Sequence, residues 1–346
     1  MKDNRVRVGQ IGLGYWGPNL LRNLLSLPNV QVVAVADLDC TRLSQVRLNS
    51  ANIETTTDSI ALLDRRDLDA VVIATPAKTH FELAWRALQT GKHVLVEKPM
   101  AMSTAKGAKL VALAEEKGLV LMVGHTFLYN AAVRRLKEYL DEGELGDVFY
   151  LYSQRLNLGR VRQDVNALWN FAPHDISIIL YLLEQMPVEV TARGFACLQP
   201  GIEDVVFMTL AFPGGVGAQV HISWLDPQKV RRMTVVGSRK MVVYDDVSTD
   251  AKIVIYDRGV DRIPTSDSPR DFNTFAEFQL LPRRGDVLIP ALDFPEPLRL
   301  ECQHFIECIL EGNRPLTDGY HGLAVVKVLE AAQRSLEKGG APRKVG

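Results

Sequence analysis

The stretch "VRVGQIGLGYWG", residues 6–17, decides the fold. Its first residues are apolar and β-branched, which predicts a buried strand, and it continues into Gly12, Gly14 and Gly17 in GxGxxG spacing. Glycines at this spacing allow a backbone to approach a pyrophosphate, and the following helix start offers free N–H groups. The stretch therefore predicts a dinucleotide-binding βαβ unit. The residues expected at the cofactor here are Gly12, Gly14, Tyr15, Trp16 and Gly17.

An acidic residue ends the next apolar run. Asp37 follows "VQVVAVA" and stands 20 residues after Gly17, where it could accept hydrogen bonds from a ribose. Its charge would repel a 2′-phosphate, and Leu38, Asp39 and Cys40 bring no arginine at once, so NAD is favoured over NADP. The alternative is a glycine-rich turn with an incidental acid.

Composition excludes several classes of protein. The chain has 346 residues, 47% of them hydrophobic, and a formal net charge of −1. It therefore has no excess of positive charge with which to bind nucleic acid or an acidic membrane surface. No signal peptide or membrane-spanning run is apparent, and the 4 cysteines form no CxxC pair. We expect a cytoplasmic protein with reduced cysteines. The 7 histidines lack metal-site spacing, so no metal is expected.

The first third of the chain alternates strand and helix patterns, which is typical of a parallel sheet covered on both faces. Within it, Thr79 and Glu82 have capping-box spacing and Gly91 provides a stop, which predicts a helix between them. A further helix is expected from Ser103 to Gly118. The fold class predicted for residues 1–124 is α/β, a Rossmann NAD-binding domain.

Beyond residue 124 strand-like runs follow one another, which predicts an α+β domain over 125–346 with a large, mostly antiparallel open sheet. In "DVVFMTLAF", 204–212, both faces are largely apolar. We therefore expect a partner subunit to cover the second face, in a homodimer or homotetramer. Residues 259–297 suggest a long excursion. Two helices are expected to finish the chain, and they could pack back on the first domain. The first of these helices should bury Cys302, Phe305, Ile306, Ile309 and Leu310.

Two strand ends carry candidate cofactor residues. In "ATPAKTH" these are Thr75, Pro76 and His80, and "HVLVEKP" ends in Glu97 and Lys98. Ligands of such sheets bind at the carboxyl ends of the strands, so the charge pair should lie in a cleft beside the nicotinamide. Lys98 would offer a cation to a substrate oxygen and Glu97 would orient it. The alternative is a surface ion pair.

The stretch "ALWNFAPHDIS" supplies a histidine, the side chain best suited to exchange a proton near neutral pH. His174 follows Pro173 and could project from a helix start into the cleft. Asp175 could orient it or cap that helix. A purely structural histidine is the alternative.

Together "GLGYWG", "ATPAKTH", "VLVEKPMA", "HDIS" and the closing "EGNRPLTDGYHGLAVVKVLEAA" resemble the Gfo/Idh/MocA family, named for glucose-fructose oxidoreductase and inositol dehydrogenase. The resemblance implies an NAD(P)-binding domain, a second domain used for substrate binding and oligomerisation, and Lys98 and His174 as the catalytic pair. Many members carry an acid four residues before the histidine, where this chain has Asn170. An amide cannot take up a proton, so more weight falls on Lys98 and His174.

Within that family, "GYWGPNLLRN" and "GHTFLYN" look most like the branch acting on nucleotide-activated sugars, such as the UDP-N-acetylglucosamine 3-dehydrogenases. Arg155, Arg160 and Arg162 could bind a diphosphate or form a solvated turn. The function expected is NAD-dependent oxidation of a sugar hydroxyl. The alternatives are an NAD-dependent glycoside hydrolase, an inositol or free-sugar dehydrogenase, and a non-catalytic NAD-binding sensor. The residues expected at the substrate are Arg155, Trp169, Asn170, His174 and Asp175.

Overall fold

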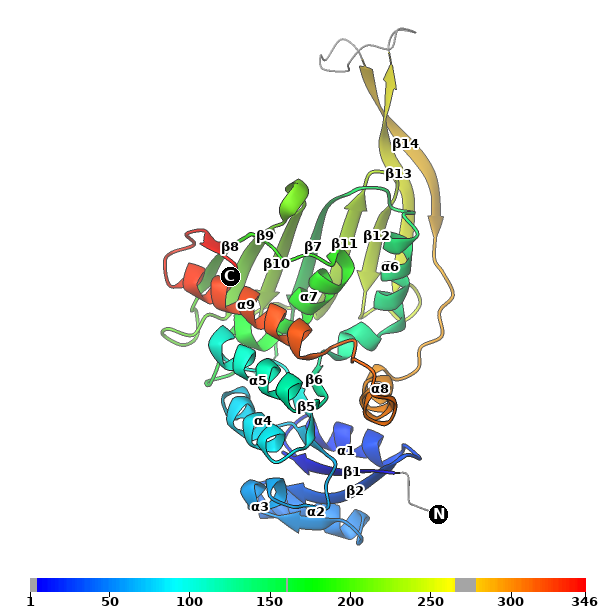
Figure 1. Ribbon diagram of the computed structural model, residues 1–346. Coiled ribbons are helices and arrows are strands. Elements are labelled where there is room, and N and C mark those ends of the chain that lie inside the picture. Colours follow the sequence, from blue (N-terminus) through cyan, green and yellow to red (C-terminus); the bar gives the residue numbers. More distant parts are fainter. Residues whose placement is uncertain (1–4, 160, 265–277) are drawn as a thin grey trace.

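The computed structural model describes residues 5–159, 161–264 and 278–346, and two sheets organise them (Figure 1). The first sheet has six strands, all parallel. Their order is β3 (Glu54–Thr56), β2 (Val30–Ala36), β1 (Val6–Ile11), β4 (Ala70–Ile73), β5 (His93–Glu97) and β6 (Leu121–Gly124). The order reverses between β1 and β4, and at such a point the loops after the two strands separate and leave room for a ligand. The predicted Rossmann fold of the first part is confirmed.

Five helices flank this sheet. They are α1 (Gly17–Leu25), α2 (Cys40–Asn49), α3 (Ser59–Leu63), α4 (His80–Gln89) and α5 (Thr104–Glu116). Ser103 caps α5 by accepting from the backbone N–H of Lys106, as the sequence predicts. The predicted capping box of α4 is wrong. A short 3₁₀ turn, η1 (Ala77–Thr79), precedes α4, and the Thr79 hydroxyl donates to the Pro76 carbonyl at 2.8 Å, while Glu82 pairs with Lys106.

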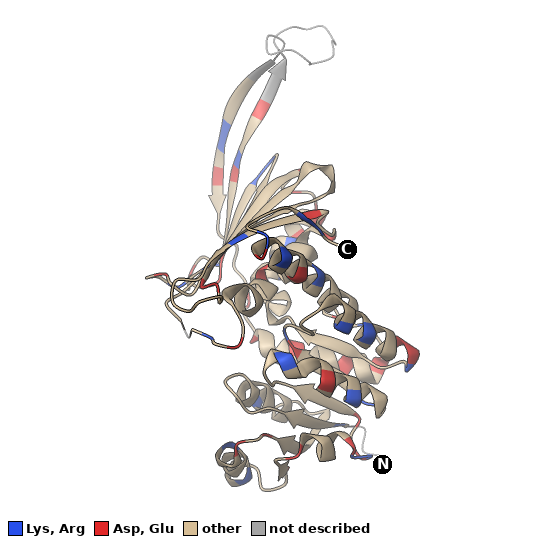
Figure 2. Ribbon diagram, turned by 90° about the vertical axis from the view of Figure 1, so that its left-hand side faces the viewer, with Lys and Arg blue, Asp and Glu red and all other residues tan. Residues whose placement is uncertain are grey.

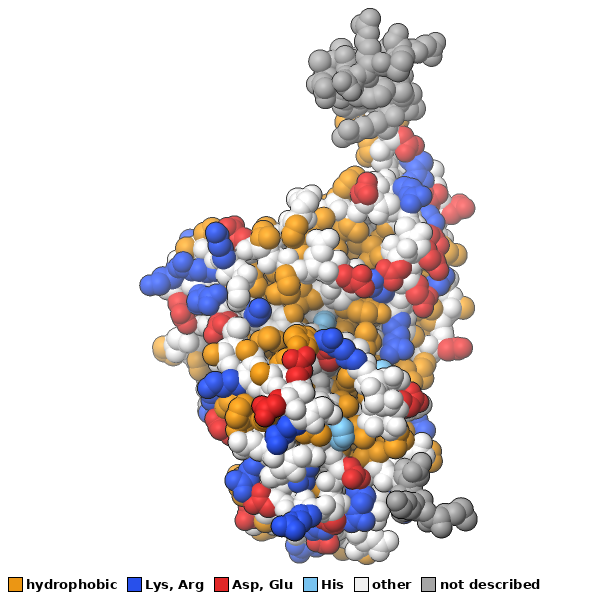
Figure 3. Space-filling model, in the orientation of Figure 1, with side chains coloured by type: hydrophobic (Ala, Val, Ile, Leu, Met, Phe, Trp, Pro, Cys, Tyr) orange, Lys and Arg blue, Asp and Glu red, His pale blue; other side chains and the backbone are white. Residues whose placement is uncertain are grey.

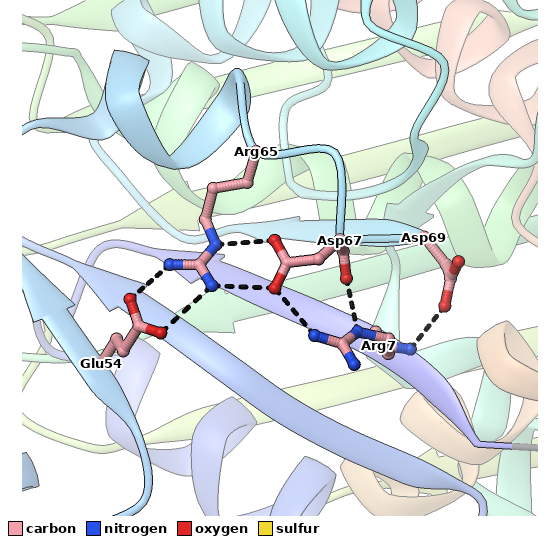
Figure 4. A network of polar contacts seen from close by, with 5 residues as sticks. All are labelled: Arg7, Glu54, Arg65, Asp67 and Asp69. Carbon is pink, nitrogen blue, oxygen red and sulfur yellow. Dashed lines mark hydrogen bonds and ion pairs between the residues drawn. The ribbon is translucent and has the colours of Figure 1, made fainter. Parts of the chain in front are cut away.

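A polar network joins the strands of the first sheet at their amino-terminal ends (Figure 4). Arg65 bridges Glu54 at the start of β3 and Asp67, and Arg7 on β1 binds the same Asp67 carboxylate at 2.7 Å. Asp69, just before β4, accepts the backbone N–H of Arg7 at 2.8 Å. The two guanidinium groups lower the pKa of Asp67 to about 2. These ion pairs lie at the edge opposite the carboxyl ends, so they hold the sheet without occupying its ligand-binding end.

The second sheet has nine strands, antiparallel except where β7 pairs with β10. Their order is β14 (Phe278–Leu288), β13 (Ile253–Pro264), β12 (Met241–Asp245), β11 (Val230–Gly237), β7 (Val148–Leu156), β10 (Gly217–Ser223), β9 (Val205–Ala211), β8 (Glu189–Phe195) and β15 (Arg343–Lys344). Helices α6 (Ala131–Asp141), α7 (Ala167–Leu183) and α9 (Gly319–Leu336) lie on one face (Figure 1). The mostly antiparallel open sheet is as predicted.

The segment expected to be a long excursion, residues 259–297, contains the end of β13 and the whole of β14. β13 and β14 pair in register from Ile255 with Leu288 to Pro264 with Phe278, and they rise from the edge of the sheet as a long ribbon (Figure 2). Residues 265–277 lie outside the described residues. The predicted excursion is therefore a ribbon of paired strands, and its position at the edge of the sheet tolerates the prolines and charged residues of this segment.

Both closing helices contact the first half of the chain. Cys302, Phe305 and Ile306 of α8 (Pro297–Glu311) join the same apolar cluster as Leu20 and Leu24 of α1. α9 packs against α5 as well as α7. The prediction that Leu310 belongs to the buried stripe of α8 is wrong, because this residue is 44% exposed.

The outer face of the second sheet carries exposed aromatic side chains among polar ones and is uncovered in the single chain. On β9, Val206 and Met208 are buried under the helices, whereas Phe207 points the other way and is 40% exposed. Phe207 contacts Phe195 on β8 and stacks on His221 of β10 at 4.3 Å between ring centroids. Figure 3 shows the other, helix-bearing face, where hydrophobic side chains also reach the surface among charged ones. Among the described residues, no helix is long and apolar enough to cross a bilayer.

Candidate active site

A single cavity of about 1390 Å³ runs from the glycine loop of the first sheet to the helix α7 under the second. Its walls include Gly12, Gly14, Lys98, Asn170 and His174. A cavity of this size exceeds the usual small-molecule pocket and has room for a dinucleotide together with a substrate.

The glycine loop has the geometry that a pyrophosphate requires. Gly12 has φ +98°, and a Cβ there would lie 2.5 Å from the Ala74 carbonyl oxygen. A Cβ on Gly17 would lie 2.2 Å from the Gly12 oxygen, so these two glycines keep the turn tight. A Cβ on Gly14 would meet no atom within 4 Å, because this residue faces the open cavity. The loop therefore fits NAD, with Gly14 leaving the space that the phosphates would occupy. Tyr15 and Trp16 line the same cavity.

Asp37 lies at the expected place, after β2. Its carboxylate accepts the backbone N–H groups of Leu13 at 2.6 Å and Asp39 at 2.8 Å, which fixes it against the glycine loop. Sequence reasoning missed Arg42, which lines the cavity and lies 3.6 Å from Asp37. The sequence feature that could have identified Arg42 is its three-residue spacing from Asp39, which places both side chains on one face at the start of α2.

The strand-end motif after β4 is only partly at the cavity. Thr75 and Pro76 line it. His80 is 1% exposed, and its ring nitrogens lie 2.8 Å from the carbonyl oxygens of Pro99 and Thr75, so the prediction that it contacts the cofactor is wrong. The imidazole instead ties together the two loops that follow β4 and β5.

Lys98 reaches across the cavity from the end of β5. Its ammonium donates to the backbone carbonyl of Asn170 on α7 at 3.0 Å. Glu97 was predicted to orient the ammonium of Lys98. Its carboxylate instead accepts the backbone N–H of Lys98 at 3.2 Å. Burial lowers the pKa of Lys98 to about 8 although Glu97 opposes this, and burial raises the pKa of Glu97 to about 7. At pH 7 Lys98 is therefore a cation held where water is scarce.

His174 also lines the cavity, but it does not begin a helix as predicted. Asn166 caps α7 eight residues earlier, by accepting the backbone N–H of Trp169, and Pro173 lies inside the helix. The His174 ring meets the ring of Phe127 edge to face, 5.0 Å between centroids. Burial, and then the positive charge of Lys98, hold the pKa of His174 well below 6.5. The imidazole is therefore neutral at pH 7 and able to accept a proton.

Asp175 neither orients His174 nor caps the helix, and its predicted contact with substrate is wrong. It is 3% exposed and accepts from Arg155 Nε at 2.6 Å and from the Ser153 hydroxyl. Arg155 lines the cavity, with its guanidinium 4.6 Å from the Phe127 ring centroid, but its charge is already balanced. This buried pair fixes α7 to β7.

Other basic residues line the cavity nearer to solvent. Arg162 does so with its charge paired to Asp164 at 2.7 Å, and Arg160 lies outside the described residues. Sequence reasoning did not single out Lys229, just before β11, or Arg231 on that strand. Both line the cavity, and Arg231 pairs with Asp246 at 3.2 Å. Only the pairing of β11 with β7 brings them there.

The amide of Asn170 has a fixed orientation. The indole nitrogen of Trp224, which is 0% exposed, lies 3.2 Å from the Asn170 side-chain oxygen. An indole N–H can only donate, so the amide oxygen must face Trp224 and the NH₂ group turns away from it. Asn170 lines the cavity and so offers donors to a bound molecule. Trp169 lines it too, and its indole N–H donates to Gln333 at 3.2 Å.

Comparison with known proteins identifies the family of the chain. Residues 6–125 match the model of an oxidoreductase family with an NAD-binding Rossmann fold, and residues 133–243 match the Gfo/Idh/MocA C-terminal domain. The chain is 28% identical to UDP-N-acetylglucosamine 3-dehydrogenase of Acidithiobacillus ferrooxidans over 267 residues, covering 77% of this chain and 82% of that protein. A solved structure of that enzyme superposes with a TM-score of 0.77 and 25% identity, covering 96% of this chain and 98% of the other.

A second relative has a different substrate. The NAD(+)-dependent scyllo-inositol 2-dehydrogenase of Bacillus subtilis is 24% identical over 349 residues, covering 97% of this chain and 96% of that protein. The first family model and both relatives are described as oxidoreductases or dehydrogenases, and the glycine loop fits NAD. The chain is therefore an NAD-binding oxidoreductase that belongs to the Gfo/Idh/MocA family.

Proposed function

We propose that the protein is an NAD-dependent dehydrogenase that oxidises a secondary hydroxyl of a nucleotide-activated sugar, such as C3 of UDP-N-acetylglucosamine. The observation that supports the proposal is that a cationic Lys98 and a neutral His174 both line the cavity that begins at the glycine loop. A base and a cation beside a nicotinamide site are what oxidation of an alcohol requires.

In the proposed reaction His174 accepts the hydroxyl proton. Lys98 and the Asn170 amide donate hydrogen bonds to the same oxygen as negative charge develops on it. The hydride would pass to NAD held at the glycine loop. The low pKa of His174 keeps it unprotonated before the reaction, and the burial of Lys98 strengthens its electrostatic effect.

Two observations support a nucleotide sugar over a free sugar. The relative that acts on UDP-N-acetylglucosamine shares 28% identity over most of the chain. The cavity is also lined by Lys229, whose positive charge suits a diphosphate, and by Arg231, whose charge is shared with Asp246 at 3.2 Å. Inositol and free-sugar oxidation is the second candidate, because the scyllo-inositol relative aligns over almost the whole chain.

A screen of UDP-sugars, inositols and free hexoses for NADH absorbance, with NADP as the control cofactor, tests the proposal. We expect NADH to accumulate with a UDP-sugar. Cleavage of a glycosidic bond without net NADH would identify a glycoside hydrolase, and NAD binding without turnover of any sugar would identify a sensor.

Asn170→Asp is expected to move the alkaline limb of the pH–rate profile upward by about one pH unit. Lys98 must be protonated to act, so the rate falls as pH rises through its pKa of about 8. A carboxylate at position 170, whose backbone oxygen already binds the ammonium, would favour the charged form and raise that pKa. Asn170→Ala should leave the limb in place whatever it does to the rate. An unmoved limb in Asn170→Asp would contradict the assignment of Lys98 as the titrating group.

We also propose that a second copy of the chain covers the outer face of the second sheet, around Phe195 and Phe207. The exposed rings of Phe195 and Phe207, and the half-buried His221 stacked on Phe207, favour burial. Phe207→Asp is expected to dissociate the oligomer, measured by size-exclusion chromatography with light scattering. Leu48→Asp, at an 85% exposed position on α2, is the control. A monomeric wild-type protein would refute the proposal.

A further inference from the structure

Arg42 lines the cofactor cavity, and its positive charge is paired with two acidic residues. It lies on α2, lines the cavity beside Leu38, and is 47% exposed. Its guanidinium lies 3.2 Å from the Asp39 carboxylate and 3.6 Å from Asp37. Thr57 and Ser59 bring hydroxyl groups to the same cavity.

The two acids are held in different ways. Asp37 is almost buried, with 9% of its side chain exposed, and both of its oxygens accept backbone N–H groups. Asp39 has 43% of its side chain exposed and caps α2 through the backbone N–H of Thr41 at 2.9 Å. Asp39 is therefore anchored on the first turn of the helix that carries Arg42, and it makes the shorter contact.

We propose that Asp39 is a specificity-determining residue, because it clamps Arg42 and so denies a phosphate-binding guanidinium to NADP. An arginine after β2 is what a 2′-phosphate needs, and a guanidinium matches phosphate oxygens through two parallel donors. The preference for NAD then has two parts, repulsion by Asp37 and the engagement of Arg42 by Asp39. Removal of Asp37 alone leaves Arg42 bound to Asp39.

Fluorescence titration of the full-length protein with NADPH and NADH, without any sugar, tests the proposal. Asp39→Asn keeps a capping side chain and removes the charge. Because the ion pair between Arg42 and Asp39 is partly exposed, its loss should lower the ratio of the NADPH to the NADH dissociation constant by about two- to fivefold. Asp37→Ser combined with Asp39→Asn should lower the ratio further than either change alone.

Two further variants make the result specific. Adding Arg42→Ala to the double variant should abolish the gain for NADPH. Asp58→Asn removes a capping carboxylate on the neighbouring helix α3, where it accepts from the backbone N–H of Ile60, and should leave the ratio unchanged. Three results would contradict the proposal that Asp39 holds Arg42. They are an unchanged ratio in Asp39→Asn, an equal fall in Asp58→Asn, and a gain that persists when Arg42→Ala is added. Because no sugar is present, the outcome is independent of the proposed substrate.

Discussion

Lys98→Met is expected to lower kcat by about 10²- to 10³-fold, the cost typical of losing one preorganised donor to a developing oxyanion. Methionine keeps most of the length and apolar volume of lysine, so the cavity should keep its shape. The ammonium is the group lost, and with it the contact that reaches from β5 to the Asn170 carbonyl at 3.0 Å. NADH affinity should change little, since the glycine loop and Asp37 remain.

Steady-state rates with the sugar found by the screen, together with NADH fluorescence titration, measure this effect. Lys106→Met is the matched control, because that lysine lies on α5 and pairs with Glu82 at 3.2 Å, away from the cavity walls. Full turnover by Lys98→Met would remove Lys98 from the reaction.

His174→Asn is expected to lower kcat/KM by about 10²- to 10⁴-fold, the usual contribution of a positioned general base. Asparagine can still form hydrogen bonds but cannot take up a proton. The variant should also lose the acid limb of the pH profile. In the wild type the rate should rise with pH through the lowered pKa of His174 and level off below pH 7, because the neutral imidazole is the active form.

His221→Asn is the control for this change, since His221 stacks on Phe207 on the outer face of the second sheet, away from the cavity. If His174→Asn kept an acid limb at the wild-type position, another group would be the base. Glu97, whose pKa is raised to about 7, would then be the first to examine.

The parts of the site that depend on local sequence were predictable. The glycine spacing, Asp37 at the end of β2 and the position of Lys98 all follow from strands whose carboxyl ends share one edge of a parallel sheet. Gly12 and Gly17 are required by contacts within the same βαβ unit, which a motif captures.

The surroundings of His174 were not predictable in the same way. Proline is common at the start of a helix, so Pro173 suggested a boundary there. The helix in fact begins at Ala167, and tertiary packing keeps Pro173 within a buried helix. The error also misplaced Asp175, whose partner Arg155 comes from β7, 20 residues earlier. Similarly, His80 looked like a ligand because nothing local shows that the Pro99 carbonyl closes on it.

The most direct test of the account is a double-variant cycle of kcat/KM for Lys98→Met and His174→Asn. Groups that act as one unit on one reacting oxygen are strongly non-additive, so we expect the double variant to be about as impaired as the worse single variant. If the two losses multiplied in full, the two side chains would be acting independently, and the shared site at the nicotinamide would be contradicted.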